Sequence, residues 1–230
     1  ELGLKKIQSK ILTAENLAKK KAETLAKKKA EEKAYKNAEL AYDNKDYQKA
    51  YREFLVLAKR NQNEGAQEYL GYMYSKGLGV AQDYKLAFSW YQKSANQGYV
   101  SAQSNLGIMF RKGRGVAQND KLATSWYRKA ANQGYAQAQF LLGYMYLEGY
   151  GVAKDYKLAV SWYRKAANQG YDLAQTNLGF MYDMGYGVTQ DFKLALSWYL
   201  KAANQENSTA QNNIGVFYKN GQGVKKDLQQ

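Results

Sequence analysis

Any chemistry in this chain would have to come from carboxylates, lysines and tyrosines. The 230 residues include no Cys and no His, which excludes thiolate and imidazole metal ligands, a Cys nucleophile and a Ser-His-Asp triad. Among the carboxylates, Glu148, Asp172 and Asp183 are isolated, and no pair has a spacing that implies a general acid and base. We therefore expect no catalytic residue, no resident metal and no cofactor, and we predict that the chain is not an enzyme.

The string Gly-x-Gly-Val is the nearest approach to a phosphate-binding loop. It first occurs at Gly77–Val80 and returns four more times. A phosphate loop follows a strand, whereas helical patterns stand on both sides of these strings. We interpret them as turns that end a helix, with Gly77 as a C-terminal cap.

Recognition of a partner is a better use for the residues that vary between the repeats of this sequence. Ala66 and the alanines at each further 36 residues lie at the start of a helical pattern. Positions three, six and ten residues after these alanines lie within about 60° of one another on a helix, away from its apolar stripe. The candidate partner-binding residues at these positions are Tyr69, Tyr72, Lys76, Asn105, Ile108, Lys112, Leu141, Tyr144, Glu148, Asn177, Phe180, Met184 and Asn213. An aromatic row with polar neighbours suits a protein partner, but packing against the adjacent repeat would also explain these rows.

Three markers share one 36-residue period and define the elements that position these residues. Trp recurs at 90, 126, 162 and 198, in register with Gly-x-Gly-Val and with Ala-Gln followed by Leu-Gly or Ile-Gly. Apolar residues follow a helical period before and after each turn, so each unit is predicted to be two helices. An interior glycine such as Gly71 normally costs about 1 kcal/mol relative to Ala, and its recurrence predicts a neighbouring helix packed on bare backbone.

Stacking is required because one such hairpin cannot bury its own apolar face. The predicted fold class is all-α: a right-handed α-solenoid of helix hairpins, preceded by a basic N-terminal helix and with essentially no strand. The tryptophans are expected to lie in its buried framework. Asp83, Asp120, Asp155 and Asp191 stand where the second helices would begin, as N-caps do.

The repeat resembles the Sel1-like family, a relative of the tetratricopeptide repeats. The family pattern is present here as Ala138, Leu142-Gly143, Tyr146, Gly149-Tyr150-Gly151-Val152, Asp155, Ala159, Trp162-Tyr163 and Ala166-Ala167. The resemblance covers units 66–101, 102–137, 138–173 and 174–209, with a half unit at 210–230. It implies that the first helices line a concave surface, which the candidate residues would face. Residues 35–65 resemble a divergent tetratricopeptide hairpin, of the kind that often precedes such arrays.

Residues 1–34 are predicted to be a basic helix or spacer rich in Ala, Lys and Glu. Residues 1–36 contain eleven Lys and five Glu, which gives a charge of +6. Leu4, Ile11, Ala18 and Leu25 are spaced by seven, but the companion positions change to Lys halfway. Three interpretations stay open: a solvated helix that caps or spaces the solenoid, a membrane-surface helix formed by residues 1–30, and a short coiled coil.

The net charge of +14 favours an acidic protein partner. Nucleic acid is disfavoured because the Lys and Arg residues are scattered along the sequence. The pairs Arg128-Lys129 and Arg164-Lys165 lie near predicted helix C-termini, where cations complement the helix dipole.

The resemblance implies a non-catalytic scaffold or adaptor that binds a partner protein on its concave face. The alternatives are an immunity-type inhibitor of a toxic enzyme, an envelope or motility-assembly component, and a membrane-surface tether. We expect a bacterial periplasmic or exported protein, with the cytoplasm as the other option. The last unit stops at Gln230 before its second helix, so we expect further chain or a partner to cover its first helix.

Overall fold

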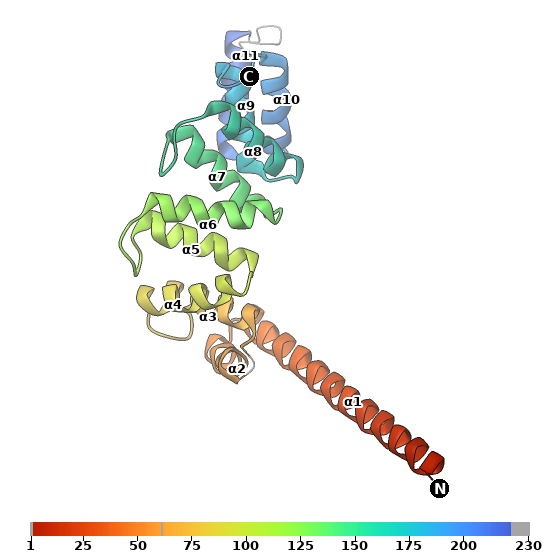
Figure 1. Ribbon diagram of the computed structural model, residues 1–230. Coiled ribbons are helices and arrows are strands. Elements are labelled where there is room, and N and C mark those ends of the chain that lie inside the picture. Colours follow the sequence, from red (N-terminus) through yellow and green to blue (C-terminus); the bar gives the residue numbers. More distant parts are fainter. Residues whose placement is uncertain (1, 61, 222–230) are drawn as a thin grey trace. The chain divides into compact units, whose positions relative to one another are not determined.

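The computed structural model describes residues 2–60 and 62–221, with side chains from residue 15 onward (Figure 1). This part of the chain forms eleven helices and contains no strand, which confirms the predicted all-α class. The helices are α1 (Leu2–Asp43), α2 (Tyr47–Arg60), α3 (Glu64–Lys76), α4 (Tyr84–Asn96), α5 (Val100–Lys112), α6 (Asp120–Asn132), α7 (Ala136–Glu148), α8 (Tyr156–Asn168), α9 (Asp172–Met184), α10 (Phe192–Ala203) and α11 (Ser208–Asn220). The chain divides into two compact units, Glu1–Asp83 and Tyr84–Gln230.

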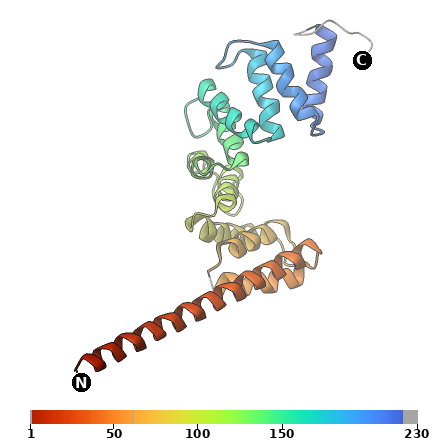
Figure 2. The same cartoon turned by 90° about the vertical axis from the view of Figure 1, so that its right-hand side faces the viewer.

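The first unit is built from α1, α2 and α3. The C-terminal part of α1 packs against α2, and α2 packs against α3. Phe54 is fully buried between Tyr35, whose ring centroid lies 5.8 Å away, and Tyr69, whose ring stacks on it at 4.4 Å. Helix α1 runs without a break past residue 34, the end of the predicted N-terminal segment. Every side chain from 15 to 30 is exposed. Figure 2 shows this N-terminal part of α1 extending beyond α2 and α3. Leu4 and Ile11 of the seven-residue spacing lie outside the described side chains.

The second unit stacks its helices in chain order. Each helix from α4 to α10 packs against the next one in the sequence, so α5, α7 and α9 each lie between the second helices before and after them. Contacts between successive hairpins are what a solenoid requires. The predicted stacking is therefore confirmed.

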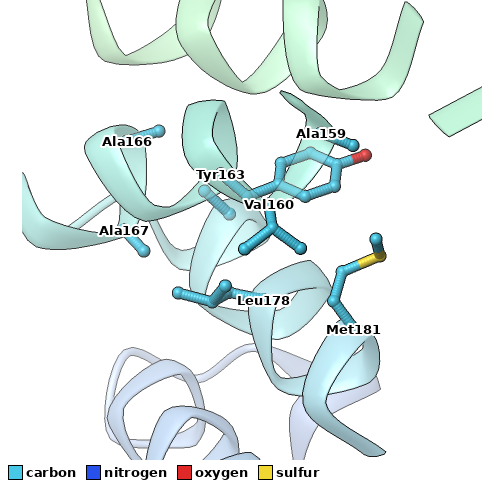
Figure 3. Packing of buried hydrophobic residues seen from close by; sticks show 8 residues of the cluster. Ala159, Val160, Tyr163, Ala166, Ala167, Leu178 and Met181 are labelled. Carbon is cyan, nitrogen blue, oxygen red and sulfur yellow. The ribbon is translucent and has the colours of Figure 1, made fainter. Parts of the chain in front are cut away.

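A buried tyrosine forms the centre of each repeat. Tyr127, Tyr163 and Tyr199 are among the largest fully buried side chains. In Figure 3 the ring of Tyr163 lies among Val160, Leu178 and Met181. An added Cβ at Gly143 of α7 would lie 2.8 Å from the Tyr163 ring. The prediction that a helix packs on the bare backbone of the interior glycines is thus confirmed at this position and at its equivalents, 107 and 179.

The tryptophans have a different position from the one expected. Trp90 is buried, but Trp126, Trp162 and Trp198 are only half-buried. A lysine three residues on lies over each ring, for example the Lys165 Nζ atom at 4.0 Å from the Trp162 ring centroid. The expectation of a tryptophan core is confirmed for Trp90 and corrected for the other three, because the adjacent tyrosine takes the inward-facing position on their helices.

The turns position one hairpin on the next. The first glycine, as at Gly149, has φ 77° and ends its helix as a left-handed C-cap. The second, as at Gly151, is so close to the Asp120 carbonyl at the start of α6 that no side chain would fit. Gly77 confirms the predicted cap in the first unit.

Side-chain N-caps then begin the second helices. Asp155 accepts a hydrogen bond from the Leu158 N–H at 2.9 Å, and Asp191 does the same for Leu194. In α6 the cap is Asn119, and Asp120 is the first helical residue. The predicted cap at Asp120 is corrected by one position.

Candidate protein-recognition face

The outermost candidate residues of the second unit lie on its first helices, α5, α7, α9 and α11. We call the side chains six and ten positions after each starting alanine the first-helix face. Its exposed members include Lys112, Glu148, Phe180 and Met184, whereas Ile108 and Tyr144 are half-buried. The exposed fraction is 37% for Phe180 and 45% for Met184. Large apolar side chains therefore reach solvent here beside charged ones.

Candidates three positions after the alanines are placed closer to the core. Asn177 lies beside the hydroxyl of Tyr163 and Asn213 beside that of Tyr199, where each amide opposes the rise in tyrosine pKa caused by burial. Asn105 and Leu141 are half-buried. This row serves the junction between successive hairpins.

In the first unit, too, the candidate three positions after the starting alanine packs toward the core. Tyr69 stacks on Phe54 and donates a 3.4 Å hydrogen bond to Glu39. Burial is the main cause of its raised pKa, followed by the nearby Glu39 carboxylate. Lys76 is exposed, and its Nζ atom lies 5.7 Å from the ring centroid of Tyr72. Lys76 is thus accessible, whereas Tyr69 and Tyr72 are half-buried and contact other rings of the unit.

Two aromatic residues in the turns were not among the candidates. Tyr150 and Tyr186 are the middle residues of Gly-x-Gly strings, and their rings lie 6.0 Å from Tyr144 and 5.9 Å from Phe180. Tyr186 also stacks on Tyr156 at 4.9 Å and remains 39% exposed. The variation of this middle position between repeats is the sequence signal that could have identified it.

A polar border adjoins the aromatic rings. The Arg111 guanidinium lies 4.1 Å from the Tyr150 ring centroid and 3.6 Å from an Asp120 carboxylate oxygen. Burial raises the pKa of Tyr144, and the Glu148 carboxylate adds to that rise. Aromatic groups edged by both signs of charge are suited to a protein surface.

Metal-binding clusters and membrane-spanning helices are not found among the described residues. No group of three metal-ligating side chains occurs among them, and none of their helices has the length and hydropathy to cross a membrane. Burial raises the pKa of the Asp183 carboxyl, but no second carboxylate is paired with it in the described contacts.

Hairpins stacked in chain order define a helical-repeat protein. A family model described as the Sel1 repeat matches residues 65–99, 100–135, 136–171, 172–207 and 208–230. The chain belongs to the Sel1 repeat family, whose members generally mediate protein–protein interaction and are typically non-catalytic.

Solved structures agree with this assignment. A Sel1 repeat protein from Oxalobacter formigenes is 37% identical, with a TM-score of 0.79 over 84% of this chain and 77% of that one. A protective antigen from uropathogenic Escherichia coli is 40% identical, with a TM-score of 0.72 over 75% of this chain and only 38% of that one. An immunity protein from Pseudomonas aeruginosa is 25% identical, with a TM-score of 0.54 over 79% of this chain and 68% of that one. The comparison with curated proteins gave no match.

Proposed function

We propose that this protein is a non-catalytic scaffold that holds a partner protein against its first-helix face. The observation that carries the proposal is the exposed apolar group on α9 and its following turn, formed by Phe180, Met184 and Tyr186. Exposed apolar groups of this kind, bordered by polar residues, mark interaction sites.

The variation of this face from repeat to repeat also supports a folded protein as the ligand. The row at the sixth position contains Tyr72, Ile108, Tyr144, Phe180 and Val216. Framework positions, by contrast, are nearly the same in every unit. A partner with an irregular surface needs a different side chain at each contact, and aromatic anchors supply most of the energy in such interfaces.

The test is affinity capture from extracts of the source cell, followed by a binding measurement with each captured protein after purification. The variant changes three residues of the apolar group: Phe180→Ser, Met184→Ser and Tyr186→Ser. A control variant changes three exposed leucines elsewhere in the second unit: Leu86→Ser, Leu122→Ser and Leu158→Ser. We expect at least about a hundredfold loss of affinity in the first variant, as for the removal of hot-spot side chains, and little change in the control. Equal affinity of the two variants for every captured protein would contradict the proposal.

An inhibitor of the immunity type is a second candidate, favoured by the likeness to the Pseudomonas aeruginosa immunity protein. Such an inhibitor would bind one enzyme with 1:1 stoichiometry and stop its activity. A scaffold would bind without inhibiting. Assay of the captured protein with and without one equivalent of this chain separates the two, and the Phe180, Met184 and Tyr186 variant should relieve any inhibition.

A further inference from the structure

Positive charge in the second unit is concentrated on its second helices. Helices α4, α6, α8 and α10 contain ten Lys and Arg residues and one carboxylate, Asp120. The first helices α5, α7, α9 and α11 contain three basic and three acidic residues. Within their bounds the two sets of helices therefore differ by nine in net charge, +9 against 0, and the N-cap carboxylates Asp155 and Asp191 lie just outside these bounds. We call the exposed sides of the four basic helices the second-helix face.

The second-helix face combines these cations with leucine. In α8, Lys157, Leu158 and Lys165 lie within about 100° of one another on the helix, and all three are exposed. The same three residue types recur at the equivalent positions of α4, α6 and α10. The leucines of α4, α6 and α8 have exposed fractions of 43%, 43% and 40%, and Leu200 adds 42% on α10. Each basic helix thus presents an apolar side chain between or beside its cations.

The charged residues that line a shallow pocket on this face are all cationic. It lies between α8 and the turn that precedes α10, and Lys157, Arg164 and Lys165 line it together with Ser161 and Val188. No carboxylate is among the residues that line it. The Arg164 guanidinium donates a 2.7 Å hydrogen bond to the Tyr182 hydroxyl, which holds it at the pocket wall. These cations match the charge of a phosphate group.

Repetition of the same residues four times identifies the kind of ligand. A uniform surface fits a ligand that is itself uniform over a large area, whereas the variable first-helix face fits a folded protein. Proteins that bind single-stranded nucleic acid offer exposed aromatic rings on which the bases stack. Here a lysine Nζ atom lies over each ring, 3.9 Å from the ring centroid of Trp126 and 4.0 Å from that of Trp162. Exposed leucines gain nothing from a phosphate backbone, but they gain from contact with lipid.

We propose that the second-helix face binds the surface of an anionic phospholipid bilayer, with lysines on the headgroup phosphates and leucines at the acyl boundary. Basic clusters are attracted to anionic leaflets, and the attraction is screened by salt. The surface is separate from the first-helix face. A membrane-bound molecule would therefore keep the first-helix face available for its protein partner.

The test is co-sedimentation of the full chain with vesicles of phosphatidylcholine that contain about 30% phosphatidylglycerol. Three variants each remove four positive charges, so that net charge is matched. The test variant is Lys85→Gln, Lys121→Gln, Lys157→Gln and Lys193→Gln. A first control, on first helices and turns, is Lys112→Gln, Arg114→Gln, Lys154→Gln and Lys219→Gln. A second control, on α1, is Lys19→Gln, Lys20→Gln, Lys21→Gln and Lys27→Gln.

We expect the test variant to lose at least about tenfold in vesicle affinity, with each control within about threefold of the unaltered chain. Circular dichroism should show the same helicity in all variants, because every substituted side chain is exposed. Leu86→Gln with Leu122→Gln and Leu158→Gln should leave binding at low salt but make it more sensitive to salt. Equal losses in all three charge variants, loss only with the α1 variant, or binding to DNA without binding to vesicles would each overturn the proposal.

Discussion

At the scale of single residues, one phenol and one missing side chain define the interior of each repeat. Tyr163 reaches from α8 to the backbone at Gly143 and is closed over by Val160, Leu178 and Met181. Burial raises its pKa well above the ordinary value of a tyrosine. Tyr127 and Tyr199 have the same raised pKa for the same reason.

These tyrosines predict an alkaline limit to stability. In the unfolded chain each phenol ionises at a pKa of about 10, while the folded protein still holds the proton. Below that pH the full stability is present, and it is lost as pH rises toward the folded pKa. Tyr163→Phe should reduce the slope of the unfolding free energy against pH in this range by up to about 1.4 kcal/mol per pH unit. Urea unfolding at neutral pH and at about pH 11 tests this, with Tyr186→Phe as the control for loss of an exposed hydroxyl. An unchanged slope in Tyr163→Phe would contradict the assignment.

Residue-level prediction from the sequence had a clear limit. The 36-residue period marks both Trp162 and Tyr163 as framework, but it does not say which of two adjacent residues faces inward. They lie about 100° apart on the helix, and the inward direction depends on where the neighbouring backbone is bare. Turn residues such as Tyr150 were missed for a related reason, because no helical period describes where a turn side chain points.

At the scale of elements, helix-on-helix approach depends on glycine at three equivalent positions. The interior glycine lets α7 and α8 approach until the Tyr163 ring touches the α7 backbone. The sequence predicted this contact correctly, because an interior glycine is costly unless something packs on it. The C-caps of the first helices were equally predictable from the position of Gly-x-Gly-Val.

A pair of alanine substitutions tests the contact. Gly143→Ala should destabilise the protein by roughly 1–3 kcal/mol, since the new methyl group overpacks the junction with Tyr163. Gly215→Ala, at the equivalent position of α11, meets nothing within 4 Å and should be neutral or stabilising by up to about 1 kcal/mol through helix propensity. Thermal or urea unfolding measures both. Two substitutions of the same sign and size would show that close approach is not what selects the glycine.

At the scale of the whole molecule, charge separates the two sets of helices in the second unit. Along the sequence the basic residues look scattered, because a count along the chain does not separate alternate helices. Once the helices are assigned, ten of the thirteen Lys and Arg residues in the helices of the second unit lie on α4, α6, α8 and α10, whereas the first helices carry three basic and three acidic residues. Repeat position alone selects the candidate residues for protein recognition, which stay a prediction, but it does not show their separation from the basic helices.

The N-terminal part of α1 is expected to be independent of the folded core. Because side chains 15–30 are all exposed, deletion of residues 1–27 should change the thermal midpoint by less than about 3 °C while reducing the helical circular dichroism signal. Deletion through residue 43 is the contrast, since it also removes the buried Ala38 and Ala41, and we expect it to destabilise the first unit. A large drop in midpoint with the shorter deletion would show that this segment is part of the core.

The second glycine of each turn has a consequence for how such a protein changes over generations. Gly151 rests on the main chain of Asp120 and Lys121, and Gly187 on that of Tyr156 and Lys157. Main-chain atoms are the same whatever the side chains are, so this junction does not discriminate between one neighbour and another. An in-frame duplication or loss of 36 codons would therefore recreate the same glycine-to-backbone contact with a different neighbouring repeat. The number of units, and with it the length of both faces, can therefore drift by whole repeats without a compensating mutation at the joint.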